Sequence, residues 1–258
     1  LALYGLACPA GVVFGPMIGL AEFHHWGFGA ITWVLGGLFA ALAAASLSLP
    51  RDRPDRERRS PFQWPERKML RPCSVLFAMA LGYGALGTYT VQEALNMGFR
   101  PFLGIPTTSA FLSCMAIGMV LMRIVMTRIG FGPDPVRMLP RMLWGTTLGL
   151  VLLAVFPGGA LRHALAAMVY GAGYSMVHTL VNTHVLEVVH PERRGAGFGA
   201  TLFSFDSGIG LGSYAIGMAI GHGVRAWGPL GYRVGWAVAA LATGMALPLA
   251  YRLIRARG

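Results

Sequence analysis

Five polar residues lie inside apolar stretches of this 258-residue chain, where they could bind a solute or carry a proton. They are Tyr83, Glu93, His178, Asn182 and Asp206. Charged and imidazole side chains are costly at membrane depth, so such residues usually line a cavity or pair with another group. The sequence therefore predicts that these five residues form a substrate or proton pathway.

Helical rise predicts the depth of each residue in the membrane. Asp206 lies about 16 Å from the start of its apolar stretch, near the midplane. His178 reaches a similar depth, and Asn182 follows it by one turn on the same helix face. Tyr83 is also central, whereas Glu93 falls near the external mouth. We expect Tyr83, His178 and Asp206 to share one cavity.

Two interpretations are open for Asp206 and for His178. Asp206 is either a buried carboxyl that loads and releases a proton during antiport, or a structural carboxylate bonded to neighbouring helices. His178 is either a substrate ligand or one member of an interhelical hydrogen bond.

The elements that hold these residues are apolar stretches of membrane-spanning length. The chain is 55% apolar and only 12% charged, and a helix needs about 20 apolar residues to cross a bilayer. Eight such stretches occur, at residues 3–20, 28–49, 73–95, 103–126, 139–156, 164–189, 196–220 and 234–254. The sequence predicts an all-α, polytopic membrane helical bundle.

The basic residues are divided unevenly between the two sides of such a bundle. Seventeen of the 21 Lys and Arg residues fall on the side that holds the basic segment 51–71, and Arg100, Arg162, Arg225 and Arg233 fall on the other. Because positive loops stay in the cytoplasm, both chain ends are predicted to be cytoplasmic, in a cell (inner) membrane. Membrane orientation explains the charge of the basic segment better than binding of anionic lipid or nucleic acid does. No nucleic-acid partner is predicted.

Cofactor and metal sites are not indicated. The three cysteines, Cys8, Cys73 and Cys114, lie in or beside apolar stretches without ligand spacing. No GxxxxGK[ST] sequence is present for a nucleotide. We expect no cofactor and no metal.

Glycine and proline mark the first apolar stretch. Gly11, Gly15 and Gly19 recur every four residues, which places them on one close-packing face. Pro16 removes a backbone donor and is expected to kink the helix. This pattern is typical of a gating element, and it also fits an ordinary proline-kinked packing helix.

A second motif runs from His190 to Gly212, where a basic P-E-R-R-G turn leads into the apolar sequence F-D-S-G-I-G-L-G. The residues of the turn and of the glycine row are predicted to serve helix packing and gating. They are Arg193, Arg194, Gly195, Gly208, Gly210 and Gly212.

The two motifs together resemble the major facilitator superfamily of transporters. The first resembles an element of the fifth helix of its proton-coupled exporters, and the second resembles the turn before the eleventh helix in its arabinose-efflux and staphylopine-exporter-like branch. The resemblance implies helices 5 to 12 of an expected twelve. Residues 1–49 would be the last two helices of the N-terminal half, residues 50–72 the cytoplasmic basic central loop, and residues 73–258 the six-helix C-terminal half.

The function that this resemblance implies is secondary active transport. In an efflux antiporter with protons as the coupling ion, a small-molecule substrate would bind between the halves and be exposed alternately to each side of the bilayer. The missing N-terminal helices of the same transporter would complete the site. A membrane-embedded enzyme using Asp206, His178 and Glu187 is an alternative that requires these side chains to meet, and an inactive truncated transporter is another.

Overall fold

The computed structural model describes residues 2–48, 66–101, 103, 107–130, 132, 134–156 and 158–255. Within these ranges the chain is helical and contains no strand. Its α-helices are α1 (Ala2–Leu47), α2 (Leu70–Asn96), α3 (Thr107–Ile129), α4 (Leu139–Val155), α5 (Ala160–Val188), α6 (Arg194–Trp227), α7 (Gly231–Gly244) and α8 (Ala246–Arg255). Short 3-10 turns are η1 (Arg67–Met69), η2 (Pro135–Met138), η3 (Pro191–Arg193) and η4 (Gly228–Leu230). The prediction of an all-α membrane bundle is confirmed.

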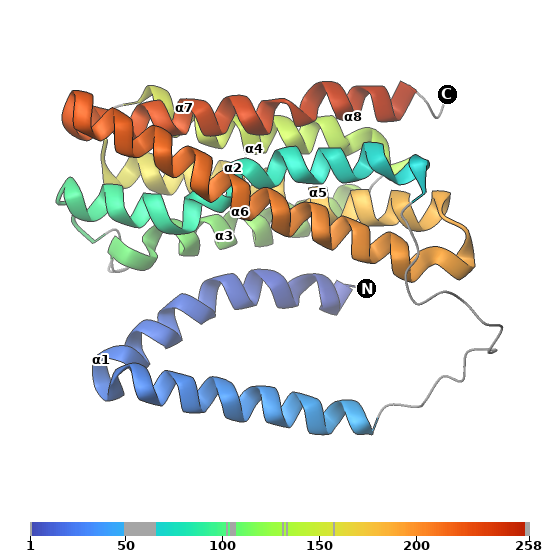
Figure 1. Ribbon diagram of the computed structural model, residues 1–258, viewed down its shortest axis with the longest axis horizontal. Helices are drawn as coiled ribbons and strands as arrows, with labels where there is room; N and C mark the ends of the chain where they lie inside the picture. The colour runs from blue at the N-terminus through green and yellow to red at the C-terminus, as the bar shows by residue number, and fades with distance from the viewer. Residues whose placement is uncertain are drawn as a thin grey trace.

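Helix α1 is a hairpin of two arms that lies along the α3 side of the remaining helices (Figure 1). Its chain reversal is at Gly27, where φ is 75° and ψ is −180°. Glycine adopts this positive φ without the steric cost that a Cβ would add. The kink at Pro16 stays a prediction, because the backbone angles of that residue are helical and the non-helical angles are those of Gly27.

The second arm of α1 exposes an apolar surface along its whole length. Trp26, Phe28, Trp33 and Phe39 are all at least two-thirds exposed, with Trp33 at 83%. A soluble domain does not leave such a surface uncovered, so this arm requires lipid or other helices around it.

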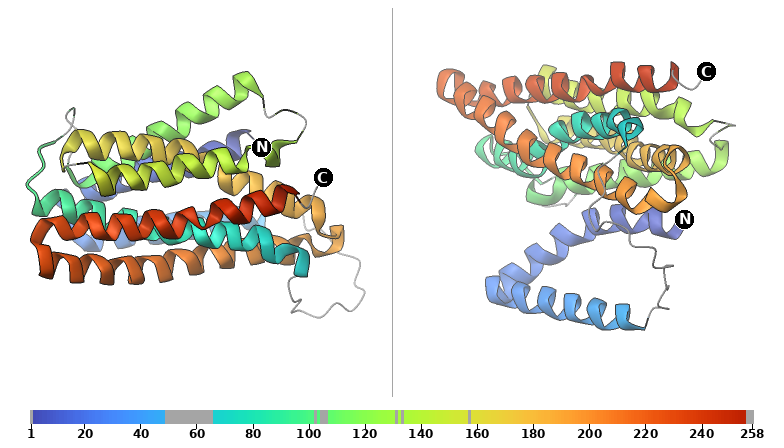
Figure 2. Two further views of the ribbon diagram at one scale, coloured as in Figure 1. Left: turned by 90° about the horizontal axis from the view of Figure 1, so that it is seen from above. Right: turned by 45° about the vertical axis from the view of Figure 1, so that its right-hand side comes forward.

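Helices α2 to α8 form the bundle. Helices α7 and α8 lie on the side opposite α1, and the views from two directions agree on this (Figures 1 and 2). They follow one another along nearly one line, interrupted at Met245. Pro248 explains the interruption, because it cannot donate the backbone hydrogen bond to the carbonyl of Gly244.

Glycines set the closest helix contacts of the bundle. A Cβ at Gly118 on α3 would overlap the carbonyl of Met168 on α5, and a Cβ at Gly171 on α5 would overlap the carbonyl of Met115 on α3. Each glycine therefore admits the backbone of the other helix, which is how helices associate in lipid without a hydrophobic driving force.

Six stretches of the described chain are long and apolar enough to cross a membrane. The last of them, Pro191–Arg255, reverses at η4, so that α6 crosses in one direction and α7 with α8 returns (Figure 1). The first arm of α1 is helical but is not among the six. The described helices lie at the predicted stretches in order, and a membrane span at residues 3–20 stays a prediction.

Candidate functional site

A row of polar and aromatic side chains follows one face of α5 through the middle of the bundle. Tyr170, Tyr174, His178 and Asn182 recur every four residues, which stacks them on one side of a helix. The rings of Tyr170 and Tyr174 are stacked with centroids 6.0 Å apart. We call these four residues the α5 row.

Helices α2 and α6 close around the α5 row with aromatic side chains. Tyr83 of α2 stacks on Tyr174 with centroids 4.8 Å apart and planes 10° from parallel. Phe205 of α6 lies 5.8 Å from the Tyr83 ring and meets the His178 imidazole edge to face at 5.4 Å. Aromatic pairs at these separations attract one another beyond their burial, so they hold three helices in register.

His178 and Asn182 are joined by a hydrogen bond. Asn182 Nδ2 lies 3.0 Å from His178 Nδ1. Since the amide nitrogen is only a donor, Nδ1 accepts, and neutral His178 carries its proton on Nε2. The other amide atom, Asn182 Oδ1, is buried without a partner among the described residues. It is an acceptor available to a ligand or a water.

Asp206 follows Phe205 on α6, the residue whose ring meets the His178 imidazole. We expected a buried carboxyl, but Asp206 is exposed in the described structure. The reason is the packing of α6. Gly208 and Gly212 lie against the backbone of Phe77 and Leu81 on α2, and Asp206 falls on nearly the opposite side of the helix.

The structure thus groups three of the five predicted pathway residues, Tyr83, His178 and Asn182, and Asp206 is next in sequence to Phe205 of the same group. Sequence reasoning missed Tyr170, Tyr174 and Phe205. A signal for the two tyrosines was present, because they continue the four-residue spacing of His178 and Asn182 toward the start of α5. Phe205 carried no such signal.

Glu93 lies elsewhere, in a buried charge cluster at the far end of α2. Its Oε1 accepts from Arg162 Nη2, and its Oε2 accepts from Trp236 Nε1 at 2.7 Å and lies 3.2 Å from His163 Nε2. Glu93 is 1% exposed. These side chains join α2, α5 and α7. Because Arg162 and His178 are about 24 Å apart along α5, the cluster is separate from the α5 row.

Two arginines are packed between helices: Arg162, which lies between two predicted spans, and Arg123, which lies within the predicted span 103–126. Arg162 is 8% exposed and bonded to Glu93. Arg123 of α3 donates from Nη2 to the carbonyl of Ser175, in the middle of α5, at 3.0 Å. Without these two the basic residues divide sixteen against three, and the bias that predicts orientation persists.

Hydrogen bonds to carbonyls at the carboxyl end of α4 explain why the Arg162 side chain is buried. Its Nη1 donates to the carbonyls of Leu153 and Phe156 at 3.0 and 3.1 Å. Arg233 donates to the carbonyls of Ala154, at 2.8 Å, and Val155. Four carbonyls that a helix end leaves unpaired are thereby satisfied by two guanidinium groups.

The predicted gating and packing residues occupy varied environments. Gly208 and Gly212 contact α2, whereas a Cβ at Gly11, Gly15, Gly19, Gly195 or Gly210 would meet no atom within 4 Å. The turn η3 is joined to the start of the bundle by an ion pair of 3.5 Å between Arg193 Nη1 and Glu66 Oε1. Arg194 begins α6.

The fold and this site define a polytopic membrane protein with a polar, aromatic-lined cluster at membrane depth. The family model of the Major Facilitator Superfamily matches residues 1–213, from the start of α1 into α6. The chain belongs to this superfamily and is a membrane transporter for a small-molecule substrate. Comparison with curated proteins gave no match.

Proposed function

We propose that this protein exports a small organic solute in exchange for protons, and that the solute binds at the α5 row. The observation that carries the proposal is the hydrogen bond between Asn182 and His178 beside the stacked rings of Tyr83 and Tyr174. Asp206 lies next to Phe205, whose ring meets His178, so three helices converge at this level. Solute sites in this kind of transporter lie near the bilayer midplane between the two halves.

The chemistry of the row suits a solute with an apolar frame and a few polar groups. Tyr83, Tyr174 and Phe205 offer ring surfaces. Asn182 Oδ1 accepts a hydrogen bond, and His178 Nε2 donates one when the ring is neutral. Pockets that combine aromatic walls with a small number of placed polar groups are typical of small-molecule sites.

Proton coupling is assigned to Asp206, with His178 as its neighbour. Charged groups at membrane depth usually line a cavity or pair with another group, and Asp206 follows Phe205, whose ring meets the His178 imidazole. Because Asp206 is exposed on α6, it can exchange a proton with water in a cavity and respond to a solute on the α5 row. The proposed direction, export, rests on the resemblance of the Gly11–Gly19 element to exporters.

The proposed organisation has two helices of an N-terminal half at residues 1–49, a cytoplasmic loop at residues 50–72 and a C-terminal half at residues 73–258. Most of the loop, residues 50–65, lies outside the described residues. The positive-inside bias supports cytoplasmic chain ends and a loop on that same side, in the cell's inner membrane. Helices of the same transporter would cover the exposed second arm of α1.

An enzyme built from Asp206, His178 and Glu187 has weaker support. Glu187 follows His178 by nine residues, about 13 Å along α5, so the two cannot act on one reacting atom. The described hydrogen bond of His178 goes to Asn182.

The test is transport by the intact protein in proteoliposomes with an imposed pH gradient. A panel of fluorescent organic solutes, including ethidium and an organic anion, is loaded on the side from which export would occur. We expect at least one solute to move against its gradient, and its movement to stop when a protonophore collapses the pH gradient. Solute transport at the same rate with and without the protonophore would refute proton coupling. Binding of a solute without any transport would refute the proposed function.

A further inference from the structure

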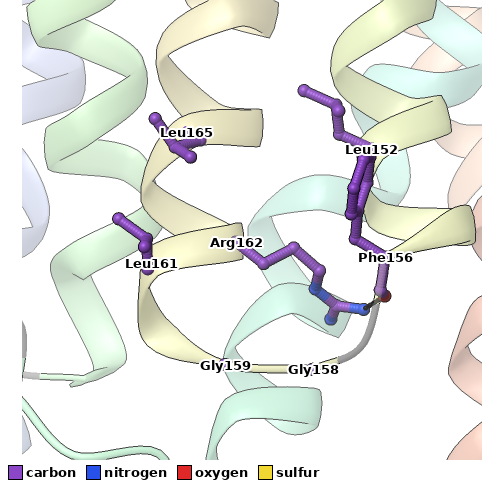
Figure 3. A pocket seen from close by; sticks show the side chains of 7 residues that line it. All are labelled: Leu152, Phe156, Gly158, Gly159, Leu161, Arg162 and Leu165. Atoms are coloured by element: carbon purple, nitrogen blue, oxygen red, sulfur yellow. Dashed lines mark hydrogen bonds between the residues drawn. The ribbon is translucent and has the colours of Figure 1, made fainter.

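A pocket of about 350 Å³ lies between the end of α4 and the start of α5, remote from the α5 row (Figure 3). We propose that it binds a phospholipid with an anionic head group. The pocket shares Arg162 with the Glu93 cluster but contains no residue of the α5 row, and its volume falls in the range of small-ligand sites.

The walls of the pocket are apolar and open toward the membrane. Leu161 and Leu165 stand one turn apart on α5, and Phe156 with Leu152 stands one turn apart on α4 (Figure 3). Leu161, Leu165 and Phe156 are 61%, 52% and 53% exposed. The two pairs form a channel parallel to the helices, the direction in which an acyl chain lies.

The end of this channel is polar and positive. Arg162 extends from α5 across the pocket toward Phe156 (Figure 3) and is more than nine-tenths buried. Its Nη1 and Nη2 are bonded to the α4 carbonyls and to Glu93, but its Nε has no partner among the described residues. An unpartnered guanidinium donor in an apolar pocket favours an oxygen ligand.

The start of α5 adds a second attraction for an anion. Gly159, the N-cap residue, makes no side-chain hydrogen bond to the first turn. The amino end of a 29-residue helix therefore presents backbone N–H groups and its positive dipole end to the pocket. Gly158 and Gly159 line the pocket without side chains that would obstruct this approach.

Net charge also favours an anion. Arg162 and Arg233 both lie at the end of α4, and Glu93 is the acidic side chain bonded to Arg162. Two cations and one anion leave this end of the two helices positive. A phosphodiester would balance the charge and accept from Arg162 Nε.

Position in the bilayer selects a lipid as the occupant. Helix α5 is about 44 Å long, whereas the hydrocarbon core is roughly 30 Å thick, so the first residues of α5 lie at head-group level. The phosphate would lie beside Arg162 and Gly159, and one acyl chain would descend between Leu165 and Leu152 toward the membrane centre.

Native mass spectrometry of the intact protein tests this proposal, with phosphatidylglycerol as the probe. A diacylglycerol with the same acyl chains is the matched lipid without a phosphate. We expect one phosphatidylglycerol retained per chain and at least tenfold less retention of diacylglycerol. Equal retention of the two lipids, or none of either, would overturn the proposal.

Variants locate the bound lipid. Leu165→Trp fills the channel and is expected to lower phosphatidylglycerol retention at least tenfold. Leu161→Trp, one turn earlier on the same wall, provides an independent obstruction with the same expected loss. Leu241→Trp is the control, because Leu241 is 74% exposed on α7 and does not line the pocket. Retention in both wall variants equal to that of Leu241→Trp would contradict the assigned site.

Discussion

Asn182 Nδ2 donates to His178 Nδ1 across one turn of α5, at 3.0 Å. This hydrogen bond fixes the imidazole tautomer and directs Nε2 away from Asn182. It also connects Asn182, through His178, to the aromatic side chains around the α5 row, because His178 meets the ring of Phe205 on α6.

Loss of this hydrogen bond should weaken transport without unfolding the protein. Asn182→Ala removes the donor and the free Oδ1 together, at a cost of about 1 kcal/mol for the bond. We expect initial transport rates to fall roughly fivefold or more. The measurement is solute flux into proteoliposomes at equal protein density.

Thr179→Ala is the control for that variant, because Thr179 lies on α5 next to His178 but is exposed and outside the row. It should retain the flux of the unmodified protein. Equal fluxes in Asn182→Ala and Thr179→Ala would show that the amide of Asn182 has no part in the solute site.

Glu93 should act as a structural anchor and not as part of the solute pathway. Glu93→Gln leaves the buried Arg162 guanidinium without its counter-charge, and breaking a buried ion pair in this way costs about 3–5 kcal/mol. For a chain of this size we expect the melting temperature in detergent to fall by roughly 10 °C.

Glu66→Gln provides the comparison, because it removes a partly exposed ion pair with Arg193 that is 3.5 Å long. Such pairs contribute about 0–1 kcal/mol. A melting temperature of Glu93→Gln as high as that of Glu66→Gln would mean that the buried cluster does not stabilise the bundle.

The crossing of α3 and α5 depends on the absence of a side chain at Gly171. A Cβ there would overlap the carbonyl of Met115, so Gly171→Ala must force the two helices apart. We expect a loss of several degrees in melting temperature and a lower yield of folded protein. Gly87→Ala on α2 is the control, because its added Cβ would meet no atom within 4 Å. Unchanged stability in Gly171→Ala would show that the crossing can relax.

Sequence patterns predicted much of the fold because lipid imposes simple constraints. Membrane-length apolar stretches predicted the helices, and four-residue spacing placed His178 and Asn182 on one face. The long-range partners could not be predicted in this way. From the sequence, Arg162 is predicted to be a cation in the loop that begins at Pro157. Its pairing with Glu93, 69 residues away in sequence, depends on how α2 and α5 pack. The chain reversal of α1 at Gly27 needed backbone geometry, since one glycine among many carries no distinct signal.

The position of Asp206 along its helix follows from the sequence, but the side of the helix on which it lies does not. Helical rise fixes how far a residue lies from the helix start, whereas the side it faces depends on which neighbours the helix selects. Gly208 and Gly212 pack against α2, and Asp206 lies on the side of α6 away from that contact.

In the proposed mechanism, Asp206 couples proton movement to solute movement at the α5 row. The most direct test compares Asp206→Asn with the unmodified protein in proteoliposomes, for a solute identified from the fluorescent panel, with and without a pH gradient. We expect Asp206→Asn to exchange solute at equilibrium, but we expect the pH gradient no longer to accelerate solute transport. Full acceleration by the gradient in Asp206→Asn would contradict this mechanism.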